Sequence, residues 1–274
     1  MRIALLQMTS GIDPLANAAV LSDAVAEAAA GGAAMLFTPE MSGLVDRDRV
    51  RAAASITDEA SDPVLAAMRA AAAEHRLWVQ LGSLAIRRPD GRLANRGFVI
   101  GPDGAVRARY DKLHLFDVAL PTGERWQESA AYAPGETAVV ADTPVGPLGL
   151  SICYDLRFPD LYRALSDAGA EVLAVPAAFT RPTGAAHWHL LLRARAVEAA
   201  AFVVAAAQTG VHEDGRTTYG HSLVVDPWGE VLLDMSEAPG LGFADLDPAV
   251  LADVRARLPV LRHRRAIPPV ERVG

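Results

Sequence analysis

Two residue types that occur once each in this chain can both do chemistry. Cys153 lies in GLSICYDLRFPD and Lys112 lies 41 residues earlier in YDKLHLFD, whereas every other one of the 26 lysine and arginine residues is an arginine. A thiol can act as a nucleophile. A lysine ammonium is a compact donor with a readily shifted pKa, which a planar guanidinium does not replace. The pair is a candidate nucleophile and charge partner; an inert buried cysteine and a surface lysine are the competing interpretations.

Two glutamates could supply the acid–base chemistry that a thiol nucleophile needs. Glu40 follows a short apolar run and Cys153 follows the run PLGLSI, so both could lie at one edge of a sheet, with Cys153 on a sharp strand-to-helix turn. Burial would raise the pKa of Glu40 towards that of a general base, while a cation and helix amides would favour the Cys153 thiolate. Glu128, in WQESAAY, would orient Lys112 or the substrate. A capping or salt-bridged Glu40 and a solvated Glu128 remain the alternatives.

Other chemistries have less support in the sequence. No G-x-S-x-G, P-loop or Rossmann glycine pattern occurs, and Ser151 lies within an expected strand. The histidines form no recognised metal-binding spacing, because His187 and His189 are two residues apart on an expected helix and point to different faces. These absences favour thiol chemistry and predict no metal site.

Composition restricts the partners and the compartment. A net charge of -7 argues against a nucleic-acid partner. A single cysteine excludes an intrachain disulfide framework and suits a reducing compartment. The N-terminal apolar stretch reads as a first strand rather than a signal peptide, and the run at 199–207 is too short to cross a bilayer. We therefore expect a soluble, cytoplasmic protein with no membrane partner.

Alternating strands and helices must position these residues. Expected strands lie at 2–8, 33–38, 77–86, 94–100, 137–142, 147–152, 171–175, 201–207, 219–226, 230–235 and 241–246, with 94–110 read as a hairpin. Expected helices lie at 14–30, 61–75, from near Pro159, at 185–198 and at 248–257. Residues 111–136 show little periodicity and are expected to be irregular and functional. We predict one domain over 1–274, with the arginine-rich residues 255–274 as a solvated or subunit-contacting arm.

Three blocks of sequence carry a family resemblance. PEM around Glu40, YDKLHLFD around Lys112 and GLSICYDLRFPDLYR around Cys153 resemble the signature blocks of the nitrilase superfamily of carbon–nitrogen hydrolases, at spacings of 72 and 41 residues. The resemblance implies an α/β fold built as a four-layer α-β-β-α sandwich, assembled into homodimers or larger homo-oligomers, with no metal or organic cofactor. The family's Glu–Lys–Cys triad falls on these three residues, and its second active-site glutamate falls on Glu128.

The resemblance also implies an activity, that of an amidase acting on carbon–nitrogen bonds other than peptide bonds, in linear amides. Cys153 would attack the amide carbon of a small molecule, and Glu40 would take the thiol proton and pass it to the departing ammonia. Lys112 and the backbone N–H of Tyr154 would form the oxyanion hole. Water would then hydrolyse the thioester intermediate.

Further blocks resemble one branch of the family. HLFDVALP, FTRPTGAAHWHLLLRARAVE, AAAQTG and YGHSLVVDPWGE resemble the amidases that act on deaminated glutathione. Omega-amidases, which act on alpha-ketoglutaramate or alpha-ketosuccinamate, share most of these blocks, but the passage from AAAQTG to YGHS favours the first branch. Phe179, Arg181, Thr183 and His187 would then line the substrate pocket, unless they form a surface loop. A non-catalytic binding protein on the same fold is the alternative of another class, which the intact triad argues against.

Overall fold

Two six-stranded sheets form the centre of the computed structural model, which describes residues 1–119, 123 and 125–274. The first sheet has the order β16 (Gly240–Asp245), β1 (Arg2–Gln7), β2 (Met35–Phe37), β3 (Trp78–Arg87), β4 (Leu93–Ile100) and β5 (Val106–Asp111). The second has the order β15 (Val231–Asp234), β14 (Leu223–Val225), β11 (Phe202–Ala205), β10 (Val172–Ala174), β9 (Gly146–Leu150) and β8 (Val140–Thr143). In each sheet three neighbouring strands are parallel, β1–β2–β3 and β9–β10–β11, and the other pairings are antiparallel.

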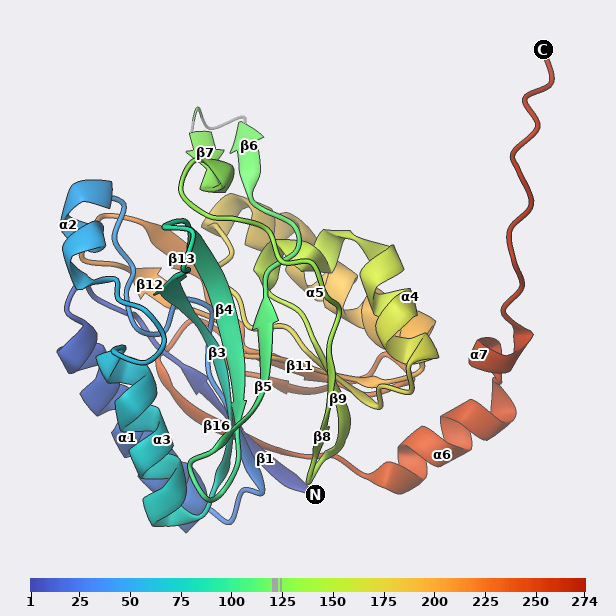
Figure 1. Cartoon of the computed structure of the whole chain (residues 1–274). Helices are drawn as coiled ribbons and strands as arrows, with labels where there is room; N and C mark the ends of the chain where they lie inside the picture. The colour runs from blue at the N-terminus through green and yellow to red at the C-terminus, as the bar shows by residue number, and fades with distance from the viewer. Residues whose placement is uncertain (120–122, 124) are drawn as a thin grey trace.

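Helices and two short hairpins surround these sheets (Figure 1). The helices are α1 (Pro14–Ala30), α2 (Arg49–Ser55), α3 (Pro63–His75), α4 (Pro159–Asp167), α5 (Arg181–Ala199), α6 (Pro248–Arg257) and α7 (Val260–His263), with 3-10 turns η1 (Glu128–Ala130) and η2 (Cys153–Arg157). The hairpins are β6 (Asp117–Ala119) with β7 (Arg125–Gln127), and β12 (Thr209–Val211) with β13 (Thr217–Tyr219). Asp13, Asp62 and Asp247 cap α1, α3 and α6 by accepting backbone N–H bonds, and each is followed by proline in the first turn.

The alternation of side chains along β1 explains the layering. Ile3 and Leu5 belong to the core that includes the second sheet, whereas Ala4 and Leu6 pack in the core that includes α1 and α3. Successive residues of a strand point to opposite faces, so a strand that is apolar at every position must be covered on both sides. The second sheet is covered in turn by α4 and α5 (Figure 1). The predicted α-β-β-α sandwich is confirmed.

Several predicted elements differ from the structure. The segment 111–136, expected to be irregular, contains the β6–β7 hairpin and η1, while its residues 120–122 and 124 lie outside the described part of the chain. The expected strand 219–226 is divided between β13 and β14, and α2 was not predicted. Helix α5 begins at Arg181 rather than at 185, because the proline at 182 suits a first turn and does not end the helix.

The predicted C-terminal arm begins within a helix that packs on the body. Arg255 lies in α6, and its guanidinium donates to the carbonyl oxygens of Ala200 and Ala170, each at 2.8 Å. Arg264 donates to Ser166 Oγ at 2.9 Å and also contacts Asp167 of α4. Residues 265–274 are exposed and run away from the sheets (Figure 1). Among the described residues, no helix combines the length and the apolar character that crossing a bilayer would require.

Candidate active site

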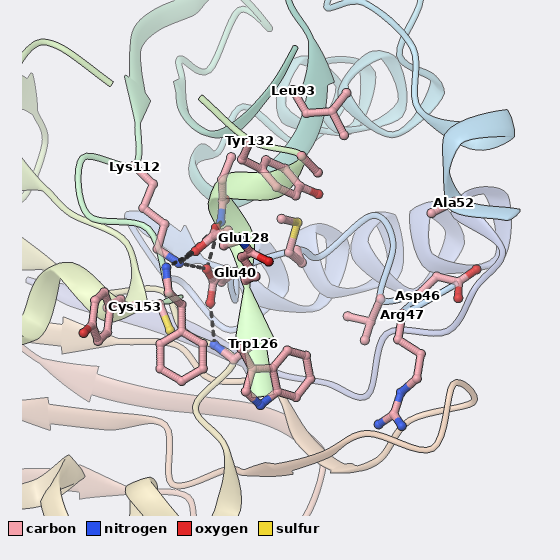
Figure 2. A pocket seen from close by; sticks show the side chains of 18 of the residues that line it. Glu40, Asp46, Arg47, Ala52, Leu93, Lys112, Trp126, Glu128, Tyr132 and Cys153 are labelled. Atoms are coloured by element: carbon pink, nitrogen blue, oxygen red, sulfur yellow. Dashed lines mark hydrogen bonds and ion pairs between the residues drawn. The ribbon is translucent and has the colours of Figure 1, made fainter. Parts of the chain in front are cut away.

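The strand ends bring the predicted site residues together. Glu40 follows β2, Cys153 follows β9 and Lys112 follows β5, and all three are buried. The carboxyl ends of parallel strands lie at one edge of a sheet, which is where α/β folds place their ligand sites. Figure 2 shows these side chains converging with Glu128, as the sequence predicted for their positions in space.

Cys153 lies on a strained turn. Its φ is +51°, a left-handed conformation that is uncommon for a residue with a side chain, and its backbone N–H donates to the Pro176 carbonyl at 2.9 Å. The turn η2 starts at Cys153 itself, so a 3-10 turn precedes α4 where the sequence suggested a helix from near Pro159. Strain of this kind persists only where the surroundings hold it, and it is concentrated at functional sites.

Lys112 joins two carboxylates. Its Nζ lies 2.9 Å from Glu40 Oε1, and 2.9 and 3.2 Å from the two carboxylate oxygens of Glu128. Glu40 Oε2 accepts the backbone N–H of Ala178 at 2.9 Å, and Glu128 Oε2 accepts that of Phe116 at 2.7 Å. One ammonium therefore sits between two oriented carboxylates, each of which is fixed by a backbone donor from another segment.

Asn95 is a member of this cluster that the sequence reasoning missed. Its Nδ2 donates to Glu40 Oε1 at 2.9 Å and to Glu128 Oε1 at 3.2 Å. The residue is 1% exposed, and its Oδ1 has no partner among the described residues. A polar amide inside the otherwise apolar strand β4 was the available signal, because a buried polar group in such a strand needs a partner.

The charges of the site differ from the expectation for Glu40 and for Cys153. Burial alone raises the pKa of Glu40, but the Lys112 ammonium and hydrogen bonds from Cys153, Lys112 and Asn95 outweigh it and hold the pKa below its usual value. Burial, and next the Glu40 charge, raise the pKa of Cys153 well above that of an ordinary thiol, although Lys112 opposes them. The pKa of Lys112 is raised because Glu128 and Glu40 overcome the cost of burial. The resting site therefore holds a carboxylate, an ammonium and a thiol, not the predicted thiolate.

Asp155 connects the nucleophile turn to the lysine segment, and the sequence reasoning did not identify it. Its Oδ2 accepts Tyr110 Oη–H at 2.7 Å and the backbone N–H of Ile152 at 2.9 Å. Its Oδ1 accepts the backbone N–H of His114 at 3.0 Å and lies 2.7 Å from His114 Nδ1. Asp155 is fully buried. It thus joins the residues that flank Lys112 to the turn that carries Cys153.

Close backbone packing positions the Glu40 turn. Gln208, in the block AAAQTG, donates from Nε2 to the Glu40 carbonyl at 3.0 Å. Gly82 of β3 lies against the preceding residues, and a Cβ at this position would stand 2.1 Å from the Thr38 carbonyl oxygen and 2.2 Å from that of Pro39. Only glycine allows β3 to approach this turn without a shift of the backbone.

A cavity of about 640 Å³ opens from Cys153, Glu40, Lys112 and Glu128. Aromatic side chains form part of its wall, namely Phe116, Trp126, Tyr132, Tyr154 and Phe179. Arginines form another part, namely Arg47, Arg49, Arg87, Arg125, Arg157 and Arg216. Figure 2 shows Arg47 and Asp46 at the far end of the labelled group from Cys153. Such a wall suits an anionic ligand of moderate size.

The four predicted substrate contacts are divided between the cavity and the surface. Phe179 and Thr183 line the cavity, and so does Tyr154, the predicted oxyanion donor. Arg181 and His187 are not among the lining residues. Arg181 begins α5 and is ion-paired with Glu237 at 2.8 Å on the surface, whereas His187 lies 3.3 Å from Arg157. The helix geometry separates them, because neighbouring positions on a helix project in different directions.

Comparisons with known proteins agree with this arrangement. The profile of the carbon–nitrogen hydrolase family matches residues 2–256. The human protein named deaminated glutathione amidase is 41% identical to this chain over 268 residues, which make up 96% of this chain and 82% of the human protein.

Two solved structures are similar in both fold and sequence. The crystal structure of the Caenorhabditis elegans NitFhit protein matches with a TM-score of 0.89 and 40% identity, covering 96% of this chain, which spans 65% of that protein. An amidase from Nesterenkonia sp. AN1, in a mutant form with acrylamide added at its active-site cysteine, matches with a TM-score of 0.78 and 31% identity over 94% of this chain and 98% of that chain.

Proposed function

Since the chain belongs to the carbon–nitrogen hydrolase family, we propose that its substrate is deaminated glutathione and that Cys153, Glu40 and Lys112 carry the reaction. The protein is an amidase, a hydrolase of carbon–nitrogen bonds other than peptide bonds, and it acts on a small-molecule substrate. The observation that supports the substrate best is the arginine-rich cavity of about 640 Å³ beside the cysteine. The proposed substrate carries a carboxylate at its oxo-acid end and another at its glycine end.

In the proposed first half-reaction, Cys153 attacks the amide carbon while its proton moves to Glu40. This order follows from the resting charges, because a thiol with a raised pKa needs a base at the moment of attack and Glu40 is a carboxylate within hydrogen-bonding reach. The carbon–sulfur bond forms, and Glu40 returns the proton to the amide nitrogen as the carbon–nitrogen bond breaks. The leaving group is the amine of cysteinylglycine when the substrate is deaminated glutathione, and ammonia when it is a primary amide.

Lys112 is proposed to stabilise the oxyanion that develops during this attack. One of its protons can serve Glu40 and one can be shared by the two oxygens of Glu128, which leaves a third for the substrate oxygen. The backbone N–H of Tyr154 is the proposed second donor. Removing one such donor typically costs about 10²–10³ in kcat.

In the second half-reaction, water attacks the thioester. Glu40 takes a proton from the water and transfers it to the departing thiolate, which regenerates the resting thiol and releases the oxo-acid with a new carboxylate. Glu128 orients Lys112, because its two oxygens both contact the ammonium while Phe116 N–H holds one of them. No group outside the chain is required for these proton transfers.

Arg157 is the proposed contact for the oxo-acid carboxylate. Its guanidinium carbon lies 5.5 Å from the centre of the Phe179 ring and 6.0 Å from that of Tyr154, the residue after Cys153. Its NH1 is 3.3 Å from His187 Nδ1, a neutral or cationic neighbour that leaves the guanidinium charge uncompensated at that contact. A carboxylate bound here would place the rest of the substrate along the arginine-lined cavity.

The decisive experiment compares kcat/KM for deaminated glutathione and for alpha-ketoglutaramate. Both substrates release alpha-ketoglutarate, so one coupled dehydrogenase assay measures both. A preference of about tenfold or more for the larger substrate, which corresponds to about 1.4 kcal/mol of transition-state binding, would support the proposal. A reversed preference would make the protein an omega-amidase, and loss of neither activity in Cys153→Ala would contradict the mechanism.

A pair of variants tests the role of Arg157. Arg157→Gln should raise KM for deaminated glutathione, because a charged hydrogen bond to the carboxylate contributes about 1.5–3 kcal/mol. Arg163→Gln is the matched control, since Arg163 lies on the surface of α4 near Asp167 and does not line the cavity. Equal KM values for the two variants would exclude Arg157 as the carboxylate contact.

Three further expectations stay as proposals. We propose that residues 1–274 form one domain with residues 255–274 as an arm, that the chain assembles into a homodimer or larger homo-oligomer, and that it works in the cytoplasm. The single thiol and the exposed apolar side chains of Ile267, Val270 and Val273 near the C-terminus support these expectations. Light scattering on the intact chain and on a chain ending at residue 264 tests the assembly.

A further inference from the structure

Three metal-ligating side chains from separate parts of the second sheet and its covering helix lie together on the surface. His189 lies on α5, His221 directly precedes the strand β14, and Asp234 ends β15. His189 Nε2 is 2.9 Å from Asp234 Oδ2, and His221 Nδ1 is 2.9 Å from Asp234 Oδ1. One ligand atom from each residue lies within 4.8 Å of the other two. None of the three lines the cavity beside Cys153.

Neighbouring groups hold two of these side chains in place. The backbone N–H of Ser236 donates to Asp234 Oδ1 at 2.8 Å, and Tyr219 stacks on the His221 ring with 4.5 Å between ring centres. His221 has a φ of +56°, and its carbonyl accepts the indole N–H of Trp188 at 2.8 Å. Contacts that orient a ligating carboxylate or imidazole from behind are a regular feature of metal sites.

The geometry is close to what a tetrahedral ion needs. Ligand distances of 2.0–2.2 Å place the donor atoms of a zinc site about 3.3 Å apart. The two histidine–carboxylate contacts are 2.9 Å, so the carboxylate has to withdraw by a few tenths of an ångström. The side chains of His189, His221 and Asp234 are 35%, 19% and 32% exposed, so an ion can enter and water can fill the remaining position.

We propose that His189, His221 and Asp234 bind one divalent transition-metal ion, with zinc as the best match to two imidazoles and a carboxylate. The ion joins α5 to the β14–β15 edge of the second sheet. It is structural, because the site is separate from the cavity where Cys153 lies. Trp188, which bonds to the His221 carbonyl, also packs on Phe179 of the cavity wall at 4.8 Å, so the ion stiffens the support of that wall.

Isothermal titration with zinc chloride tests this site on a tag-free chain that carries Cys153→Ala. That background removes the thiol, which would otherwise compete for zinc. We expect one zinc ion per chain and, at free zinc a hundredfold above the Kd, a rise in Tm of about 5 °C or more. Addition of a chelator should reverse the rise.

Two variants in the same background identify the ligands. His189→Ala and Asp234→Asn should each weaken zinc binding by at least about tenfold and abolish the rise in Tm. His187→Ala is the matched control, because His187 is exposed on the same helix two residues away and should leave zinc binding unchanged. Absence of stoichiometric binding, or equal binding in all variants, would overturn the proposal and leave a hydrogen-bonded His–Asp–His group.

Discussion

Replacing Lys112 by arginine should nearly abolish the amidase activity although it keeps the positive charge. The ammonium is 2% exposed and contacts three carboxylate oxygens of Glu40 and Glu128 at 2.9–3.2 Å. A guanidinium is larger and planar, so it cannot place its donors in the same three directions from the same point. The proposed third proton, which faces the substrate oxygen, is lost as a result.

The expected effect follows from the loss of one oxyanion donor. Such a loss lowers kcat by about 10²–10³, or about 2.7–4 kcal/mol of transition-state stabilisation. Overpacking of the enclosed site costs a further 1–3 kcal/mol or so of folding stability. Lys112→Met should be at least as inactive and about 3–5 kcal/mol less stable, because two buried carboxylates then lose their cation. The difference in stability between the two variants separates charge from shape.

Steady-state kinetics with deaminated glutathione and thermal unfolding measure these effects together. The matched control is Arg107→Lys, the reverse exchange at an exposed pair with Asp103, which should change stability by less than about 0.5 kcal/mol. A Lys112→Arg variant with a kcat within threefold of the parent would refute the reasoning. It would show that charge alone, and not the compact shape of the ammonium, is what this position supplies.

Three further outcomes are expected. In the parent protein, the rate of Cys153 alkylation by iodoacetamide should keep rising above pH 9 or so, because its pKa is raised; Glu40→Gln should move the midpoint of that profile to lower pH, since it removes the negative neighbour but keeps Lys112, and an unchanged midpoint would contradict the assigned cause. Asp155→Asn should lower the free energy of unfolding by at least about 2 kcal/mol and reduce kcat more than it raises KM, because donors from Tyr110, Ile152 and His114 lose a charged acceptor; denaturant melts and kinetics measure both, and parent-like values of both would count against the connecting role. Gly82→Ala should destabilise the chain by about 1–3 kcal/mol, because its Cβ would meet the Thr38 carbonyl at 2.1 Å, and a parent-like Tm would show that β3 can shift freely.

The sequence alone identified the principal groups of the candidate site. Glu40, Lys112, Cys153 and Glu128 were recognisable because reactive side chains directly after apolar runs lie at strand ends, and because the surrounding blocks resemble a known family. The layered fold was equally predictable, since period-two and helical patterns depend on neighbours close in sequence. The capped starts of α1, α3 and α6 are local in the same way, because each depends on an aspartate followed by a proline.

Tertiary structure decided the features that depend on distances between remote segments. The carboxylate state of Glu40 and the thiol state of Cys153 result from burial set against a cation 72 and 41 residues away, and a pKa shift is the balance of such opposing effects. Asn95 and Asp155 became functional candidates only through the partners that folding brings to them. The same holds for His189, which meets His221 and Asp234 although their spacing in the sequence predicts no metal site. Spacing along the chain sets which residues are available, and packing of the two sheets sets which of them meet.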